Sequence, residues 1–258
     1  FMSYIEEFKK QIASNNYLPF LKLWEEYCLN EEVNASELYE ILSMVNDSIF
    51  ADGFGKHVET AVTLWEAVKS QENTYRILKL IFDIQTTNSS SLANLACSVL
   101  QEKYGDHKYY NEKIRLVGLR NKQNFRGALT NFELLNHMDK GKFVFHTGGW
   151  GTGEIMEISL IREQLILEFD LVPGRKDLSF QNAFYNLVPL SDDHFFSMRF
   201  GDPDNLENKA KKDPVSVIKM LLNDLGPKTA AEVKDELCQL VIPESDWTKW
   251  WQNARTKL

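Results

Sequence analysis

Residues 143–155 read FVFHTGGWGTGEI, and this stretch marks the change from a helical region to a β region. Phe143 and Phe145 alternate with Val144, which is the period-two pattern of a strand. Four glycines follow within six residues and favour a tight turn between two strands, because glycine adopts positive φ freely. A phosphate-binding loop is excluded, since Glu154 follows the last glycine where a Lys-Ser/Thr pair would be needed.

Downstream of the turn, period-two alternation continues. One face is apolar and the other acidic, the apolar residues being Leu165, Leu167, Phe169 and Leu171 and the acidic ones Glu168 and Asp170. Further strands are predicted over residues 154–161 and 185–190. An open sheet this small leaves unpaired edges, so residues 140–191 are predicted to close into an SH3/Tudor-like β-barrel, with Leu165, Leu167 and Phe169 inside.

Upstream of the turn, residues 1–139 are predicted to be helical throughout, because apolar residues recur at helical spacing. The segments around Trp24 and Trp65 resemble each other and lie 41 positions apart. That period suits a pair of helices per repeat, as in HEAT- or TPR-like solenoids, with the two tryptophans in equivalent buried sites. A helical bundle without repeats is the alternative interpretation. Either way the chain is a multidomain, mainly α protein.

Beyond the barrel, residues 192–212 are interpreted as a linker and residues 213–258 as a three-helix, helix-turn-helix-like unit. Asp213-Pro214 starts the first of these helices, and Thr229 and Glu232 form a capping box for the second. The third stops in mid-pattern without a C-cap, which favours a piece of a longer protein. Phe1 precedes Met2, which we interpret as the natural start.

Composition excludes several classes of protein. In the 258 residues, 43% are hydrophobic and 26% charged, which is typical of a globular chain, and no apolar run is long enough to cross a bilayer. No signal peptide opens the sequence, and the cysteines Cys28, Cys97 and Cys238 lie far apart, so a cytoplasmic protein with reduced thiols and no membrane contact is predicted. The net charge of −8 argues against a nucleic-acid coat protein.

Motifs for chemistry are missing from the sequence. The five histidines lie apart, no H-E-x-x-H or Cys/His pairing occurs, and neither G-x-S-x-G nor S-x-x-K is found. We therefore predict no enzyme activity, no catalytic residues, no metal, no cofactor and no small-molecule substrate.

Seven residues are candidates for binding a partner. A basic stretch without acids supplies four of them, and the turn and the last helix supply aromatic side chains: Arg115, Arg120, Lys122, Arg126, His146, Trp150 and Trp250. A solvated basic surface, a structural histidine and a tryptophan packed in the core are the competing interpretations. Trp250 and Trp251 point about 100° apart on a helix, so one of the two is expected to remain partly exposed.

Two motifs resemble a known family. The stretch from Phe143 to His146, followed by residues 149–155, resembles the Tudor-like RNA polymerase interaction domain of CarD-type regulators and of the transcription–repair coupling factor. The pattern of Trp247, Trp250, Trp251 and Ala254 looks like the unit that follows this domain in long, multidomain Gre-type elongation factors. The resemblance implies a non-catalytic RNA polymerase-binding module that tethers or regulates such a factor.

The chain departs from Gre factors in one respect, because it shows no pair of long heptad helices joined by an acidic tip. The resemblance therefore implies the extension that precedes the Gre module, without transcript cleavage. The alternative function is a nucleic-acid-binding module that uses residues 229–240 as a reading helix, with weak contact to DNA or RNA. The charges of that helix are mostly acidic, which counts against contact with phosphates.

Overall fold

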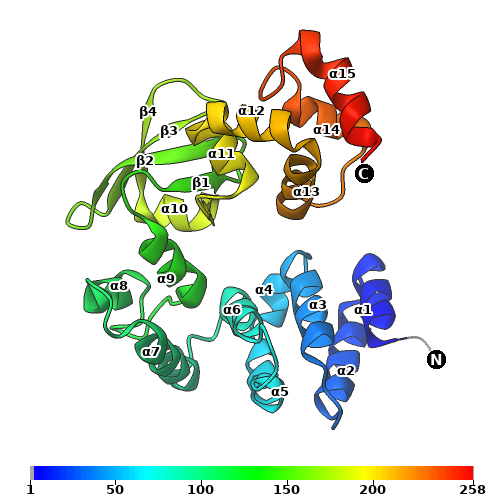
Figure 1. The fold of residues 1–258 in the computed structure, drawn as a ribbon. Helices are drawn as coiled ribbons and strands as arrows, with labels where there is room; N and C mark the ends of the chain where they lie inside the picture. Colours follow the sequence, from blue (N-terminus) through cyan, green and yellow to red (C-terminus); the bar gives the residue numbers. More distant parts are fainter. Residues whose placement is uncertain (1–2, 258) are drawn as a thin grey trace. The chain divides into compact units, whose positions relative to one another are not determined.

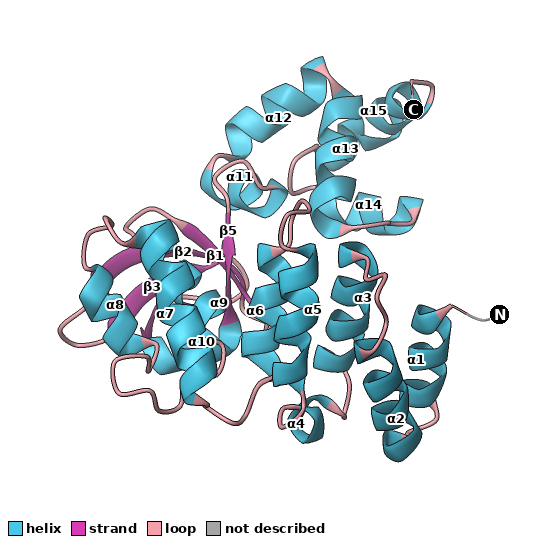
Figure 2. Cartoon of the chain, turned by 90° about the horizontal axis from the view of Figure 1, so that it is seen from below, coloured by secondary structure: helices cyan, strands magenta, loops and turns pink. Residues whose placement is uncertain are grey.

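The computed structural model describes residues 3–257 as a mainly helical chain with one antiparallel sheet (Figures 1 and 2). It divides into two compact units, residues 1–135 and 136–258. The first unit is helical, as the sequence predicted, and contains α1 (Tyr4–Ala13), α2 (Tyr17–Cys28), α3 (Ala35–Asn46), α4 (Ala51–Phe54), the 3-10 turn η1 (Val58–Thr60), α5 (Ala61–Val68), α6 (Tyr75–Ile84), α7 (Ser90–Tyr104), α8 (Tyr110–Leu116) and most of α9 (Ala128–His137).

Helix α3 is central to the N-terminal half of this unit, because it packs against α1 on one side and α6 on the other. It begins at the N-cap Asn34, whose side chain accepts hydrogen bonds from the Ser36 and Glu37 amides. Its inner face is apolar and fully buried, through Leu38, Ile41, Leu42 and Val45. Spacing of three and four residues puts these side chains on one stripe, which explains why the sequence predicted the helix.

The two echoing tryptophans do not occupy equivalent buried sites, so that prediction is wrong. Trp24 is 2% exposed and donates from Nε1 to Thr60 Oγ1 (2.9 Å), whereas Trp65 is only half-buried and donates to the Thr74 carbonyl oxygen (3.2 Å). The HEAT/TPR-like repeat remains a prediction, since the echo behind it covers too few residues to fix the surroundings of each ring.

One buried acid makes the first unit sensitive to pH. Asp83 of α6 accepts a hydrogen bond from the Thr130 hydroxyl of α9 (3.1 Å). Burial raises the pKa of Asp83 to about 6, although Thr130, Lys79 and Arg126 oppose the shift. The folded pKa lies above the unfolded value of about 3.9, so the folded state holds the extra proton. This group's stabilising contribution is complete below about pH 4 and is lost as the pH rises through about 6.

Asp83→Asn is therefore expected to stabilise the chain by about 1 kcal/mol at pH 8, a value discounted because the carboxyl retains some contact with water. Urea unfolding at pH 5 and pH 8 measures the effect, which should shrink at the lower pH. Asp52→Asn is the matched control, because Asp52 pairs with Arg126 but its side chain is 85% exposed. A loss of stability at pH 8 on Asp83→Asn substitution would contradict the assignment.

The second unit begins with a five-stranded antiparallel sheet in the order β4-β3-β2-β1-β5. The elements are β1 (Phe143–His146), β2 (Gly151–Ser159), β3 (Gln164–Phe169), β4 (Arg175–Ser179), α10 (Phe180–Asn186) and β5 (Leu187–Leu190). The predicted inward residues Leu165, Leu167 and Phe169 are buried, which confirms their alternation. Leu171 is 68% exposed because β3 ends at Phe169. Strands β4 and β5 stand at the two ends of the order, so closure into a Tudor-like barrel stays a prediction.

Residues 192–212, interpreted from the sequence as a linker, contain two helices. Helix α11 (Phe195–Gly201) covers the sheet face opposite the buried leucines, with the Phe196 ring stacked on Phe145 at 5.4 Å. Helix α12 (Pro203–Lys212) buries Leu206 and Ala210, while its lysines face solvent. Leu206 and Ala210 form a short apolar stripe on the buried face of α12, away from its three exposed lysines.

The predicted three-helix unit is present as α13 (Pro214–Leu225), α14 (Ala230–Leu237) and α15 (Glu244–Arg255). Asp213 caps α13, and Thr229 and Glu232 form the predicted capping box of α14. The same core also includes residues of α11 and α12, such as Phe195 and Leu206. Five helices rather than three therefore share this core.

Candidate functional site: the rim of the sheet

The turn between β1 and β2 is built on stacked rings. His146 and Trp150 lie face to face with ring centroids 4.3 Å apart, and the Phe169 ring meets both edge-on. His146 is only 5% exposed, whereas Trp150 is half-buried. Strand alternation explains the difference, because His146 points to the same inner face as Val144. His146 is therefore a supporting side chain, and of the two predicted anchors only Trp150 reaches the surface.

His146 also fixes the course of the turn as a neutral side chain. Its Nδ1 accepts the Gly148 amide hydrogen (3.0 Å), so the ring must be unprotonated at that atom. Burial lowers the pKa of His146 below the usual histidine value, which favours the same neutral form. The histidine therefore offers no positive charge to a partner at neutral pH.

The glycines of this turn are required by geometry. Gly149 and Gly151 have φ of +92° and +79°, where other residues are strained. A Cβ on Gly151 would also lie 2.0 Å from Asp170 Oδ1, and one on Gly153 would lie 2.5 Å from the Phe169 ring. The turn prediction is confirmed at Gly149 and Gly151, whereas Gly153 is needed for space rather than for backbone conformation.

An exposed apolar side chain lies beside Trp150. The Leu171 amide donates to the Trp150 carbonyl oxygen (3.4 Å), and the Leu171 side chain is 68% exposed. On the other flank, the Thr147 amide donates to the Asn186 carbonyl oxygen (2.8 Å) at the end of α10. We call residues 147–150 together with Leu171 the rim surface. An exposed leucine and a half-exposed tryptophan on a braced turn are suited to docking against a protein.

A single arginine joins this rim to the C-terminal helices. Arg199 of α11 pairs with Glu236 of α14, and its Nη2 lies 3.9 Å from Asp170 Oδ2. Asp170 Oδ1 in turn accepts the Thr152 amide hydrogen at 2.8 Å. Burial raises the pKa of Asp170, although the Thr152 amide and Arg199 favour its charged form. The Arg199 side chain is 15% exposed, so its contacts with Asp170 and Glu236 are little screened by water and connect the end of the sheet to α14.

The predicted basic residues lie in the first unit, mostly in contacts within the chain. Arg115 pairs with Glu112, Lys122 donates to Asn94 Oδ1 (2.8 Å), and Arg126 pairs with Asp52. The hydrogen bond from Arg115 is the main cause that lowers the pKa of Glu112. Arg120 is exposed, and its charge lowers the pKa of Glu112 further. Glu112 lies one helical turn before Arg115, whereas Asn94 and Asp52 come from distant segments that no local pattern could connect to Lys122 and Arg126.

The structure places Trp250 in the core of the C-terminal helices. It is 8% exposed, and its Nε1 donates to the Ala210 carbonyl oxygen at 2.7 Å in a buried hydrogen bond. Trp251 stacks on Trp247 at 5.7 Å and is partly exposed. The expectation that one of the two tryptophans reaches the surface holds, and the exposed one is Trp251.

Among residues 3–257, no group of three or more His, Cys, Asp or Glu side chains is arranged to hold a metal ion. None of the helices described is long and apolar enough to cross a membrane.

Comparisons with known proteins agree with the family resemblance. The GRAD helix-turn-helix domain matches residues 196–258, which span α11 to α15. Transcription elongation factor GreA of Chlamydia pneumoniae is 48% identical over 257 residues, which is 100% of this chain and 36% of that protein. GreA of Chlamydia trachomatis serovar D is 46% identical with the same coverage. GreA of Borreliella burgdorferi is 25% identical over 79% of the chain and 22% of that protein.

The chain thus spans 36% of the length of the two chlamydial relatives. Its predicted resemblance to a long Gre-type elongation factor is confirmed by these matches. No solved structure shows a significant match to the chain.

Proposed function

We propose that this chain is a non-catalytic, cytoplasmic module of a Gre-type transcription elongation factor, and that it binds RNA polymerase. The observation that carries the proposal is the similarity over its whole length to part of two GreA proteins. A second contact with the polymerase would raise the effective concentration of the rest of the factor near its site of action. The rim surface is the part of the module that we assign to this contact.

The physical support for the rim surface is its rigidity together with its exposed apolar side chains. Trp150 is backed by His146 and Phe169, so its ring loses little conformational entropy when a partner covers it. Leu171 adds an apolar side chain that the chain itself leaves uncovered. Aromatic side chains in such positions are the residue types that dominate binding energy at interfaces.

The test is a binding measurement with purified core RNA polymerase, double-stranded DNA and single-stranded RNA over a series of salt concentrations. The proposal expects saturable polymerase binding that changes little with salt, and weak, steeply salt-dependent binding to either nucleic acid. Nucleic-acid binding tighter than polymerase binding would reject the proposal.

Leu171→Ser is expected to weaken polymerase binding about tenfold without loss of stability, because the side chain makes its contact only in the complex. Trp150→Ala should weaken binding by about 2 kcal/mol, with some loss of stability from the broken stack. Ile161→Ser is the matched control, since Ile161 is 98% exposed in the turn at the far end of β2. Equal affinities for the Leu171 and Ile161 variants would remove the rim from the interface.

The second candidate function is nucleic-acid binding, favoured by the helix-turn-helix description of the domain that matches residues 196–258. The surface of α14 argues against it, because the exposed side chains Glu232 and Asp235 outnumber Lys234. Glu236 is engaged with Arg199 and adds no positive potential. Phosphate contacts would need the opposite balance of charge.

A further inference from the structure

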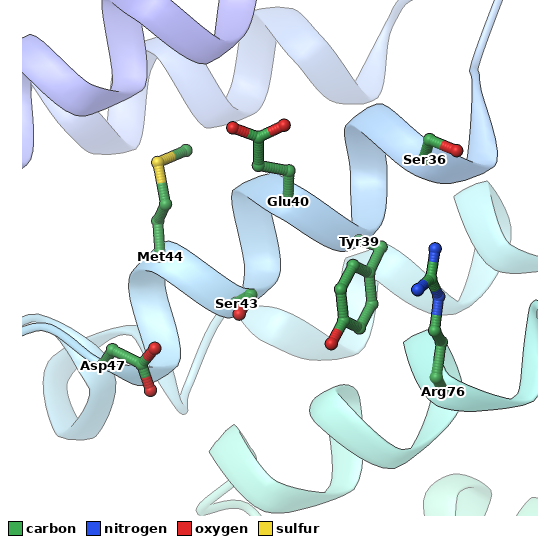
Figure 3. A pocket seen from close by; sticks show the side chains of 7 residues that line it. All are labelled: Ser36, Tyr39, Glu40, Ser43, Met44, Asp47 and Arg76. Atoms are coloured by element: carbon green, nitrogen blue, oxygen red, sulfur yellow. The ribbon is translucent and has the colours of Figure 1, made fainter. Parts of the chain in front are cut away.

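The outward face of α3 forms the floor of a pocket in the first unit. Figure 3 shows six of its side chains along one side of the helix, with Arg76 reaching in from α6. Each of the six has another member three or four positions away, as one helical face requires: Ser36, Tyr39, Glu40, Ser43, Met44 and Asp47. The volume is about 360 Å³, enough for a few side chains of a ligand. We call this the α3 groove.

One end of the groove carries the positive charge of Arg76. The guanidinium of Arg76 lies over the Tyr39 ring, with Cζ 3.8 Å from the ring centroid (Figure 3). Arg76 is exposed, and no carboxylate pairs with it among the described residues. Stacking on the Tyr39 ring restricts the Arg76 guanidinium, so the guanidinium can bind a carboxylate with little further loss of conformational entropy.

The other end of the groove carries a negative charge in an unfavourable place. Asp47 is the C-cap of α3, where the helix dipole already presents partial negative charge. Asp47 is exposed, and within residues 3–257 its side chain has only a 3.4 Å contact from the Asn46 amide. A cationic group of a ligand would be attracted both by the Asp47 carboxylate and by the partial negative charge at the C-terminus of α3. Glu40 lies between the two ends but is already paired with Lys9 of α1 at 3.7 Å.

The middle of the groove supplies adaptable apolar contact. Met44 and the Tyr39 ring are half-buried, and Ser43 lies between them on the stripe. A methionine can follow different ligand side chains because it is unbranched and flexible. Along the helix the Arg76 guanidinium therefore comes first, then apolar surface beside the Lys9-paired Glu40, and then the Asp47 carboxylate.

We propose that the α3 groove binds an extended peptide segment of a partner protein, through an acidic residue at Arg76 and a basic residue at Asp47. Tyr39 and Asp47 are eight residues apart on α3, which corresponds to about 12 Å along the helix axis. An extended chain covers that distance in three to four residues. The peptide therefore carries its acid and its base three or four positions apart, with an apolar residue between them. This proposal does not rest on the polymerase-binding function.

The experiment uses the full chain and synthetic peptides with blocked ends. Each peptide carries one Glu and one Arg, separated by one to eight positions in a Ser/Ala background with a single Leu between them where the spacing allows. Fluorescence polarisation should show the highest affinity at separations of three or four. Arg76→Ala and Asp47→Ala should each weaken binding of that peptide at least tenfold, whereas substitution of an exposed arginine in the second unit, Arg162→Ala, should leave the affinity unchanged.

A charge exchange separates recognition from loss of folding. Arg76→Glu should reject the best peptide and should bind the version whose Glu is replaced by Lys. Affinity that does not depend on the separation of the charges, or on Arg76, would overturn the proposal. A maximum at seven or eight positions would also overturn it, because that spacing belongs to a helical ligand.

Discussion

Replacing Trp24 with alanine is expected to lower the free energy of unfolding by about 3–5 kcal/mol. The ring is 2% exposed and contacts Phe54 edge-on, with centroids 5.0 Å apart. The substitution leaves a large cavity and also removes the hydrogen bond from Nε1 to Thr60 Oγ1. Urea unfolding followed by far-UV circular dichroism measures the loss in the full chain.

Trp65→Ala is the matched comparison for Trp24, and it should cost less, about 2 kcal/mol, because the Trp65 ring is only partly buried and its removal leaves a smaller enclosed cavity. Trp65 is half-buried and bonds to a backbone carbonyl nine residues along the chain rather than to a distant helix. Equal losses for both variants would restore the view that the two tryptophans occupy equivalent sites in a repeat.

The sequence identified helices well where one face is buried against a neighbour. The stripe of Leu38, Ile41 and Val45 was readable as period-3.6 spacing, and α3 has the predicted inner face. The different burial of Trp24 and Trp65 could not be predicted from this spacing. The surroundings of the Trp24 ring include Thr60, which lies more than 30 positions along the chain. A short echo in the sequence contains no information about such distant residues.

The interpretation of residues 192–212 as a linker missed the two helices in this segment. Asp202-Pro203 repeats the cap signal of Asp213-Pro214, and Leu206 and Ala210 are four residues apart. Both signals were present in the sequence, but the linker was inferred from the distribution of prolines and glycines, which does not reveal a short apolar stripe. An apolar stripe of two residues is enough for a helix when a large core, here that of α13 to α15, lies beside it.

The candidate site was predictable only in part. The position of the turn followed from its glycines, whereas His146, which was expected on the exposed rim, lies on the same buried face as Val144. The exposure of Leu171 depends on the end of β3, which alternation alone could not locate. The link from Arg199 to Asp170 and Glu236 joins three separate segments, so no local pattern could indicate it.

Trp250→Ala is expected to destabilise the second unit by about 3–5 kcal/mol. The side chain is 8% exposed in the core shared by α11 to α15. Its removal also leaves the Ala210 carbonyl without the Nε1 donor, and a buried acceptor without its partner adds to the cost. Thermal unfolding of the full chain should show the unit that contains α15 melting earlier, while the unit of α1 to α8 is unchanged.

Trp251→Ala separates this structural role from partner binding. Trp251 is partly exposed and stacks on Trp247, so its loss should cost about 1 kcal/mol of stability. If α15 takes part in the interface, polymerase binding should fall for the Trp251 variant at a temperature where the variant is fully folded.

A Trp250 variant as stable as the parent chain would contradict the buried hydrogen bond to Ala210 and would return Trp250 to the surface as a partner-binding residue.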